Sequence, residues 1–468
     1  MKPCVVVDIV GLTLRQLGEH TPNLSEFCAR GTRAPLASVL PAVTCSAQAT
    51  MLTGSLPAQH GAVGNGWFDR DNAEVALWRQ SNALVRGKKV YELGRERDSS
   101  FTCAKLFWWW NMGAAVDWSI TPRPFYPADG RKIPAVYGWP RSYPGELEQR
   151  LGAFPFFDFW GPKSGLPSSR WIADAAIATL ELHHPTLTLV YLPHLDYSHQ
   201  QFGPQDPRSR AALREIDVVF GDLLRAARGA GASVLVVSEY GLEAVDTPID
   251  INRVLRRAGL LEVRETPAGE VLDVFGSAAF AVADHQVAHV YARSEQAREH
   301  AANVLRNTPG VAEVLDRAAQ RRFGLEHARS GDLVAVARKG AWFTYYYWLA
   351  DERAPDFART VDIHRKPGYD PCELFLDPAL RAPKLRIALR LAQKLAGQRY
   401  LMDVIPLDAR LVKGSHGRLV EDPLDGPLLL SDEPLGAAEL SRDGSLPMTS
   451  VCERILARIF APGARSGA

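Results

Sequence analysis

The chain has 468 residues, of which 46% are hydrophobic and 23% charged, and its formal net charge is +1. This length allows two or three ordinary domains, or one large α/β domain with an insertion. The charge balance gives no reason to expect a nucleic-acid polymer or a membrane surface as a partner. No segment holds the roughly 18 uninterrupted apolar residues of a membrane span. No signal-peptide pattern and no Cys-x-x-Cys pair is present, so we expect a cytoplasmic protein with reduced thiols.

Three runs rich in Val and Leu, at 4–11, 186–200 and 232–241, predict buried parallel strands that each end in polar residues. Helices are predicted at 21–31, which has a Thr cap, an early Pro and a terminal Gly, and at 209–231, where apolar residues recur at helical spacing. The alternation of strands and helices predicts an α/β fold with a doubly wound, mostly parallel sheet.

The pattern changes between residues 250 and 349, where short strand-like pieces such as 280–293 alternate with a helical stretch. We expect this segment to be an inserted α+β cap subdomain. The α/β core would then comprise residues 1–249 and 350–468. Within it, the Trp-, Pro- and Gly-rich tract at 107–171 is expected to be irregular and to lie near the site.

Carboxylates follow all three predicted strands, as Asp8, Asp196 and Glu239. In a doubly wound sheet the functional site forms outside the carboxyl ends of the strands. A single carboxylate there is commonly a helix cap or a loop acceptor. Three together are harder to explain as caps, so they indicate a site.

The order of five motifs resembles the alkaline phosphatase superfamily and, within it, the nucleotide pyrophosphatase/phosphodiesterase branch. The motifs are an early strand-end Asp, a Thr followed nine residues later by Thr-Gly, an Asp segment ending in Gly-Pro, the sequence Ser-Glu-Tyr-Gly and a late Gly-Ser-His-Gly. The resemblance covers roughly residues 1–425. It implies a metal-dependent hydrolase of small phosphate esters, with phosphodiesters or pyrophosphates favoured over monoesters. A Thr nucleophile would form a covalent phosphothreonine.

Carried over by motif, the resemblance implies that Thr44 is the catalytic nucleophile, because Thr53 and Gly54 follow it at the family's spacing. Asn65 matches the family's substrate-orienting Asn and would hold a phosphoryl oxygen. By itself it could equally be a Gly-flanked turn residue. Trp108 lies in an aromatic run where related enzymes contact a flat substrate group, although burial in an aromatic cluster is the alternative.

The resemblance also implies one or two divalent metal ions, Zn or Mn, and it maps their ligands onto this chain. The expected ligands are Asp8, Thr44, Asp196, Glu239 and His416.

Two histidines of the family's ligand set are missing. Gln200 takes the place of one, with His199 a single residue earlier, and Tyr240 takes the place of the other. The remaining set is rich in oxygen, which shifts the expectation from Zn towards Mn, or towards a single metal. Further possible ligands are His199, Gln200, Tyr240, Asp362 and His364.

The segment 360–371 offers a compensating group, since His364 could enter the metal shell and Arg365 or Lys366 could clamp an anionic substrate. A solvated loop with local ion pairs is the alternative.

Two other functions stay open at this point. The same fold and metal site could act on another bond, in a phosphonate, a glycoside or a specialised metabolite. The chain could also be a non-catalytic binder of a phosphorylated ligand, although a Thr nucleophile would then be unnecessary. The sequence predicts no oligomeric state.

Overall fold

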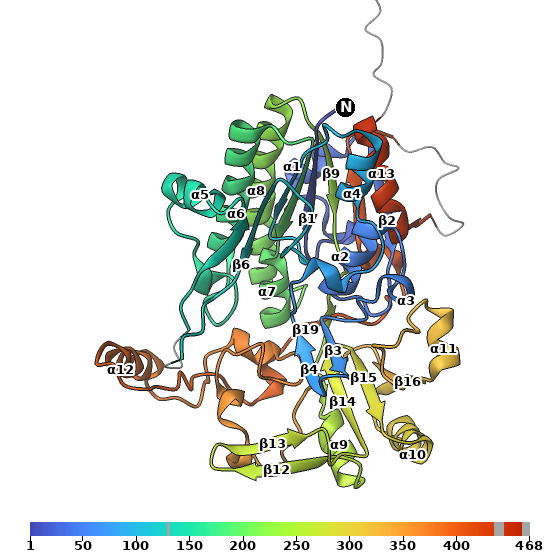
Figure 1. Ribbon diagram of the computed structural model, residues 1–468, viewed down its shortest axis with the longest axis vertical. Helices are drawn as coiled ribbons and strands as arrows, with labels where there is room; N and C mark the ends of the chain where they lie inside the picture. The colour runs from blue at the N-terminus through green and yellow to red at the C-terminus, as the bar shows by residue number, and fades with distance from the viewer. Residues whose placement is uncertain (129–131, 435–443, 461–468) are drawn as a thin grey trace, which may run out of the picture.

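The computed structural model describes residues 1–128, 132–434 and 444–460 (Figure 1). A nine-stranded sheet forms its centre. Its strands follow the order β21 (Leu446–Pro447), β2 (Thr32–Ala37), β20 (Leu428–Ser431), β9 (Ser233–Val237), β1 (Cys4–Ile9), β8 (Leu187–Leu192), β5 (Cys103–Leu106), β6 (Trp118–Pro122) and β7 (Val136–Trp139).

The middle of this sheet is parallel, because β1 pairs in parallel with β8 and β9, and β5 with β8 and β6. Antiparallel pairings occur where β20 meets β9 and β2, and where β7 meets β6. The doubly wound, mostly parallel α/β fold is therefore confirmed. Strand β1 is buried along its whole length, which explains its near-continuous apolar sequence.

Helices cover both faces of the sheet (Figure 1). On one face, α6 (Leu166–His183) packs on α8 (Pro207–Gly229), and on the other α13 (Val451–Phe460) contacts α4 (Val90–Arg97) and α2 (Thr44–Thr53). Among the described residues, no helix has both the length and the apolar character needed to cross a membrane. All six cysteines are buried and unpaired, in keeping with the expected reduced thiols.

The segment after β8 differs from the prediction of a strand running to residue 200. The strand ends at Leu192, and Pro193 leads directly into helix α7 (His194–Phe202). This matters because successive helical residues point about 100° apart, whereas residues four apart lie on the same face. Asp196 and Gln200 therefore share a face that His199 does not.

The cap lies beyond the carboxyl edge of the sheet (Figure 1). It contains an antiparallel sheet in the order β14 (Ala279–Asp284), β15 (Val287–Ala292), β17 (Leu333–Ala337) and β16 (Val311–Leu315), with α10 (Glu295–Arg306) packed against it.

The cap has its own hydrophobic core, which runs from Val245 to Val412. The predicted boundary at residue 349 therefore falls inside this core, because later residues such as Cys372 and Ile405 also pack into it. The tract 107–171 is partly regular, since β6, β7 and α5 (Tyr143–Leu151) lie in it.

The remaining α-helices and strands belong to the core, to the cap and to the segments around them. They are α1 (Pro22–Phe27), α3 (Pro57–His60), β3 (Gly66–Asp69), β4 (Glu74–Leu77), β10 (Glu243–Ala244), β11 (Thr247–Ile249), α9 (Ile251–Arg257), β12 (Glu262–Thr266), β13 (Gly269–Asp273), α11 (Arg317–Arg322), β18 (Ala341–Phe343), α12 (Pro383–Leu395) and β19 (Gly414–Ser415).

Candidate active site

The three strand-end carboxylates converge at one edge of the central sheet. Asp8 lies near the end of β1, in register with Tyr191 of β8 and Val237 of β9. Asp196 and Glu239 follow those two strands within a few residues. All three carboxylates are buried. The site therefore forms where parallel strands end, as the sequence predicts.

Thr44 is the first residue of α2 and lines a cavity at this edge. Its Oγ1 lies 3.2 Å from the Tyr240 hydroxyl, which in turn donates to Asp196 Oδ1 at 3.4 Å. These three side chains form a continuous path for a proton from the Thr44 hydroxyl to a buried carboxylate.

Gln48, one helical turn after Thr44, is a site residue that sequence reasoning missed. Its Nε2 donates to Glu239 Oε1 at 2.6 Å and to Asp8 Oδ2 at 3.3 Å. Its Oε1 accepts the Trp109 backbone N–H at 2.6 Å, which fixes the orientation of the amide. The sequence held a signal for it, because Gln48 is a polar residue four positions after the expected nucleophile in a segment of mostly small and apolar residues.

The carboxyl groups of this site hold protons more tightly than exposed ones. Burial raises the pKa of Asp8 well above its usual value, and the negative charge of Glu239 raises it further. Burial also raises the pKa of Glu239. Within the described part of the chain, Asp8 Oδ1 and Glu239 Oε2 have no hydrogen-bond donor, so a proton on one of them can bridge to the other. Burial raises the pKa of Asp196 to about 7, with the charge of Glu239 adding to the effect.

Gln200 occupies the position on α7 where the family has histidine. Its Nε2 donates to Asp196 Oδ2 at 2.7 Å, and its Oε1 accepts the Tyr369 hydroxyl at 2.7 Å. His199 is buried on another side of the helix, with its Nε2 3.5 Å from Gln16 Nε2. It does not line the cavity. Because both residues lie in a regular helix, His199 cannot take the place of an imidazole at position 200.

Four rings stack through the site, in the order Tyr240, His416, His285 and Tyr369. The ring centroids lie 3.5, 3.7 and 3.7 Å apart along the stack. His285 comes from the turn between β14 and β15, so the cap supplies part of the site. Nothing in the sequence placed this turn next to the strand ends.

Both stacked histidines are neutral, since burial lowers the pKa of each well below its usual value. His416 Nδ1 donates to the Ala42 carbonyl at 2.7 Å, and His285 Nδ1 donates to Asp284 Oδ1 at 2.9 Å. Each Nε2 atom lacks a hydrogen-bond partner among the described residues.

Asn65 links the start of α2 to the cap. Its Oδ1 accepts the Cys45 backbone N–H at 3.0 Å, while its backbone N–H and its Nδ2 donate to Asp284 at 2.8 and 3.1 Å. One amide hydrogen of Nδ2 is left for a substrate oxygen. The substrate-orienting role of Asn65 stays a prediction.

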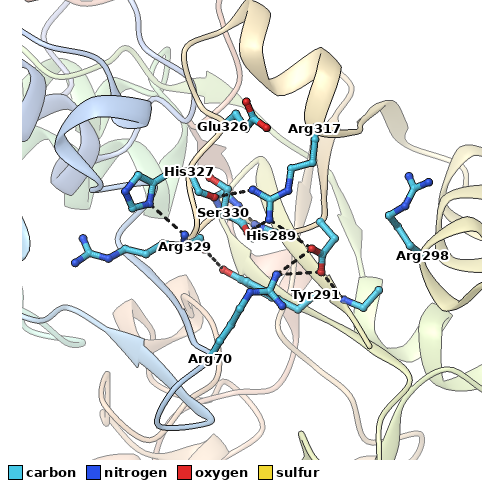
Figure 2. A network of polar contacts seen from close by, with 12 residues as sticks. Arg70, His289, Tyr291, Arg298, Arg317, Glu326, His327, Arg329 and Ser330 are labelled. Atoms are coloured by element: carbon cyan, nitrogen blue, oxygen red, sulfur yellow. Dashed lines mark hydrogen bonds and ion pairs between the residues drawn. The ribbon is translucent and has the colours of Figure 1, made fainter. Parts of the chain in front are cut away.

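A network of polar contacts holds the loop that precedes Asn65 (Figure 2). His289 Nε2 donates to the Val63 carbonyl at 2.9 Å, and Arg329 donates to the Gly61 carbonyl at 2.8 Å. Asp332 accepts from Arg70 at 3.0 Å and from Arg317 at 3.4 Å. These contacts come from the cap, which therefore positions Asn65 through the backbone.

The cavity above Thr44 has an aromatic wall and few charges. Trp109 lines it, whereas Trp108, the residue singled out from the sequence, is fully buried in the main core. The cationic side chains on the wall are Arg123 and Lys132. The aromatic lining residues are Trp78, Trp109, Tyr126, Phe156, Phe159, Trp160, Tyr191, Tyr197, Tyr240, His285, His364 and Tyr369.

The segment 360–371 supplies four cavity residues, Val361, Ile363, His364 and Tyr369, and two cations that do not line the cavity. Lys366 is buried, with its Nζ 2.7 Å from carboxylate oxygens of both Asp370 and Glu373. Arg365 is exposed and pairs with Asp362 at 3.2 Å. The predicted clamp on an anionic substrate is therefore corrected, since these cations already neutralise neighbouring carboxylates. Asp362 likewise lies outside the cavity wall.

The residues at the strand ends do not fit the metal pair that the resemblance implies. Nowhere in the described ranges do three His, Cys, Asp or Glu side chains gather as a possible ligand set. The carboxylates of Asp8, Glu239 and Asp196 accept hydrogen bonds from glutamine amides instead. His416 and His285 each have the form of a ligand, with Nδ1 bonded to an acceptor oxygen and Nε2 without a hydrogen-bond partner among the described residues.

The comparisons with known proteins agree with this fold. Phosphonoacetate hydrolase from Sinorhizobium meliloti 1021, in complex with phosphonoacetate, has a TM-score of 0.62 at 16% identity, with 98% of this chain and 96% of that chain covered. Murine ectonucleotide pyrophosphatase/phosphodiesterase 5, in an inactive form in complex with AMP, has a TM-score of 0.57 at 14% identity, covering 98% and 95%. Such low identities show the fold alone.

A curated relative from Schizosaccharomyces pombe, described as an uncharacterized pyrophosphatase/phosphodiesterase, is 26% identical over 243 residues. That match covers 50% of this chain and 42% of the relative, so it spans less than half of the relative's length. The family described as type I phosphodiesterase / nucleotide pyrophosphatase matches residues 4–370 of the 468. The chain therefore belongs to the type I phosphodiesterase/nucleotide pyrophosphatase family.

Proposed function

We propose that the protein is a phosphoester hydrolase of small molecules in which Thr44 is the nucleophile. The observation that carries this proposal is the position of the Thr44 hydroxyl, which lies on the cavity wall and contacts Tyr240, itself bonded to Asp196. Membership of the family supports the reaction class. Ligands such as AMP and phosphonoacetate in fold relatives support a small substrate.

In the proposed reaction, a new bond forms between Thr44 Oγ and phosphorus while the bond from phosphorus to the leaving oxygen breaks. The hydroxyl proton of Thr44 passes to Tyr240, and the Tyr240 proton passes to the Asp196 carboxylate. The leaving oxygen takes a proton from solvent. Water then attacks the phosphothreonine and gives up a proton to solvent, while the Asp196 proton returns through Tyr240 to Thr44 Oγ and regenerates the hydroxyl.

The charge of the site favours a phosphodiester over a monoester. Asp196 is the carboxylate on the cavity wall, and the cations there are Arg123 and Lys132. A diester carries one negative charge and a monoester close to two, so the diester meets less repulsion. The aromatic wall suits an apolar or aromatic leaving group.

The test is hydrolysis of bis-p-nitrophenyl phosphate and p-nitrophenyl phosphate by the full chain. We expect faster turnover of the diester, and Thr44→Ala should lower its kcat by about 10³-fold or more. The matched control is Ser46→Ala, which lies two residues later on the same buried helix and not on the cavity wall. Acid-quenched protein should carry a phosphoryl mass on Thr44. Undiminished turnover by Thr44→Ala would exclude the nucleophile.

A second candidate is hydrolysis of an uncharged bond on the same fold. It is favoured by the largely aromatic wall of the cavity, which offers few charges to bind a phosphate. Turnover of p-nitrophenyl acetate or a p-nitrophenyl glycoside, with none on either phosphate ester, would select it.

A further inference from the structure

We propose that this chain does not assemble the metal pair expected of its fold, and that glutamine amides occupy the places of the two cations. The inference concerns the resting protein. The metal content of the purified chain tests it, independently of the proposed hydrolysis.

The first step is the orientation of Gln48. An amide oxygen can ligate a cation, but an amide NH₂ group only donates hydrogen bonds. Gln48 Oε1 is already taken by the Trp109 N–H at 2.6 Å, so Nε2 faces the carboxylates. Nε2 lies 2.6 Å from Glu239 Oε1 and 3.3 Å from Asp8 Oδ2, in the space between them that a shared cation would need.

The second step is the same arrangement at Asp196. The Tyr369 hydroxyl donates to Gln200 Oε1 at 2.7 Å, which directs the NH₂ group of Gln200 at Asp196 Oδ2, also at 2.7 Å. The carboxylate therefore meets an N–H donor at the position where the family's imidazole would leave room for a metal. The two glutamines have the same placement, because Gln48 lies one helical turn after Thr44 and Gln200 one helical turn after Asp196.

The third step concerns the rings. The lone pair of an imidazole nitrogen lies in the plane of its ring, so two ligands of one cation must direct their planes at a common point. His416 stacks on Tyr240 at a centroid distance of 3.5 Å with the two planes 7° apart, whereas His285 lies 3.7 Å from His416 with the planes tilted by 37°. His416 Nε2 lies 3.9 Å from Asp196 Oδ1, the same oxygen that accepts the Tyr240 hydroxyl at 3.4 Å. Tyr240 therefore places a phenol hydroxyl, and not a second imidazole nitrogen, beside His416 and Asp196.

The experiment measures metal on the full chain purified without chelator, incubated with Zn²⁺ or Mn²⁺ in excess, desalted and analysed by mass spectrometry of the elements. We expect about 0.1 equivalent or less per chain, and no rise in unfolding temperature when either ion is added. One equivalent or more retained by the wild-type chain overturns the proposal.

A converted variant tests whether these side chains exclude the cation. Gln48→Ala with Gln200→His and Tyr240→His removes both glutamine amides and adds two imidazoles, and we expect it to retain at least about tenfold more metal than the wild type. Gln80→His is the matched control, because Gln80 lines the same cavity but bonds Thr121 and Pro122. If the triple variant is folded by circular dichroism and still binds no metal, the assignment to these residues is overturned. If it does not fold, the wild-type measurement decides.

Discussion

Two buried carboxyl pairs in this molecule are neutralised in different ways. In residues 366–373, Asp370 and Glu373 share the ammonium group of Lys366. Both N–O distances are 2.7 Å, and all three side chains are at most 2% exposed. At the strand ends, Asp8 and Glu239 share the amide of Gln48, which brings no charge.

The difference shows in the pKa values. Burial alone would lower the pKa of Lys366, but the charges of Asp370 and Glu373 raise it above its usual value, and burial raises the pKa of Glu373 while the charge of Lys366 opposes that rise. At the strand ends no cation opposes the effect of burial, and the pKa values of Asp8 and Glu239 rise. A buried pair without a counter-ion keeps its protons available, which suits a site of proton transfer better than a structural contact.

Removal of the lysine should have the largest effect on stability. Lys366→Met leaves two buried carboxylates without a counter-charge, and we expect a loss of about 3–5 kcal/mol in the free energy of unfolding at pH 7. Urea titration followed by circular dichroism measures it. The control is Lys339→Met, an exposed lysine paired with Glu421 at 3.6 Å, for which we expect at most about 1 kcal/mol. Equal losses in the two variants would remove the contrast between the clusters.

The next largest effect should be on the pH dependence of stability. The pKa of Asp196 is raised from 3.8 to about 7, so its contribution to stability is fully present below pH 3.8 and is lost as the pH rises through about 7. Asp196→Asn keeps the shape without the charge. Between pH 5 and pH 8 it should remove up to about 3 kcal/mol of this loss, since about two pH units of that range lie below the raised pKa and each corresponds to about 1.4 kcal/mol. The measurement is the unfolding temperature at pH 5 and pH 8. An unchanged pH profile in the variant would contradict the raised pKa.

The effect of removing the bridging amide of Gln48 should be smaller. Gln48→Leu removes the donor to Asp8 and Glu239 and the acceptor of the Trp109 N–H, so we expect a destabilisation of about 1–3 kcal/mol. The loss should grow as the pH rises through about 7, where Glu239 ionises because burial raises its pKa to about 7. Gln80→Leu also removes a buried amide but faces no carboxylate, and its loss should not depend on pH. Equal pH dependence in both variants would contradict the bridging role.

The smallest effect is expected in the network of Figure 2. Arg70 pairs with Asp332 at 3.0 Å, with 39% and 23% of the two side chains exposed, so solvent screens the pair. Arg70→Ala should cost at most about 1 kcal/mol in thermal unfolding. A loss as large as that of Lys366→Met would show that exposure does not separate the two kinds of pair.

Much of the fold could be read from the sequence. The Val-rich runs at β1, β8 and β9 marked the central strands, because strands covered on both faces need apolar residues at nearly every position. The expected family is confirmed. The end of β8 was misjudged, since an apolar run followed by polar residues does not show that Pro193 begins a helix.

The site could be read only in part. Asp8, Thr44, Asp196 and Glu239 were found because motif spacing and strand ends are local features of the chain, and their catalytic and ligand roles stay predictions. Gln48 and His285 were missed, because their roles depend on what faces them.

The sequence by itself determined which carboxylates follow the central strands, since the positions of Asp8, Asp196 and Glu239 after apolar runs are local features of the chain. The tertiary structure alone decided how those carboxylates are satisfied. Trp109 and Tyr369 orient the two glutamine amides, and the cap brings His285 onto His416. Hydrogen-bond direction and burial arise between segments distant in the chain, so they set proton affinity and the room for a cation only after folding.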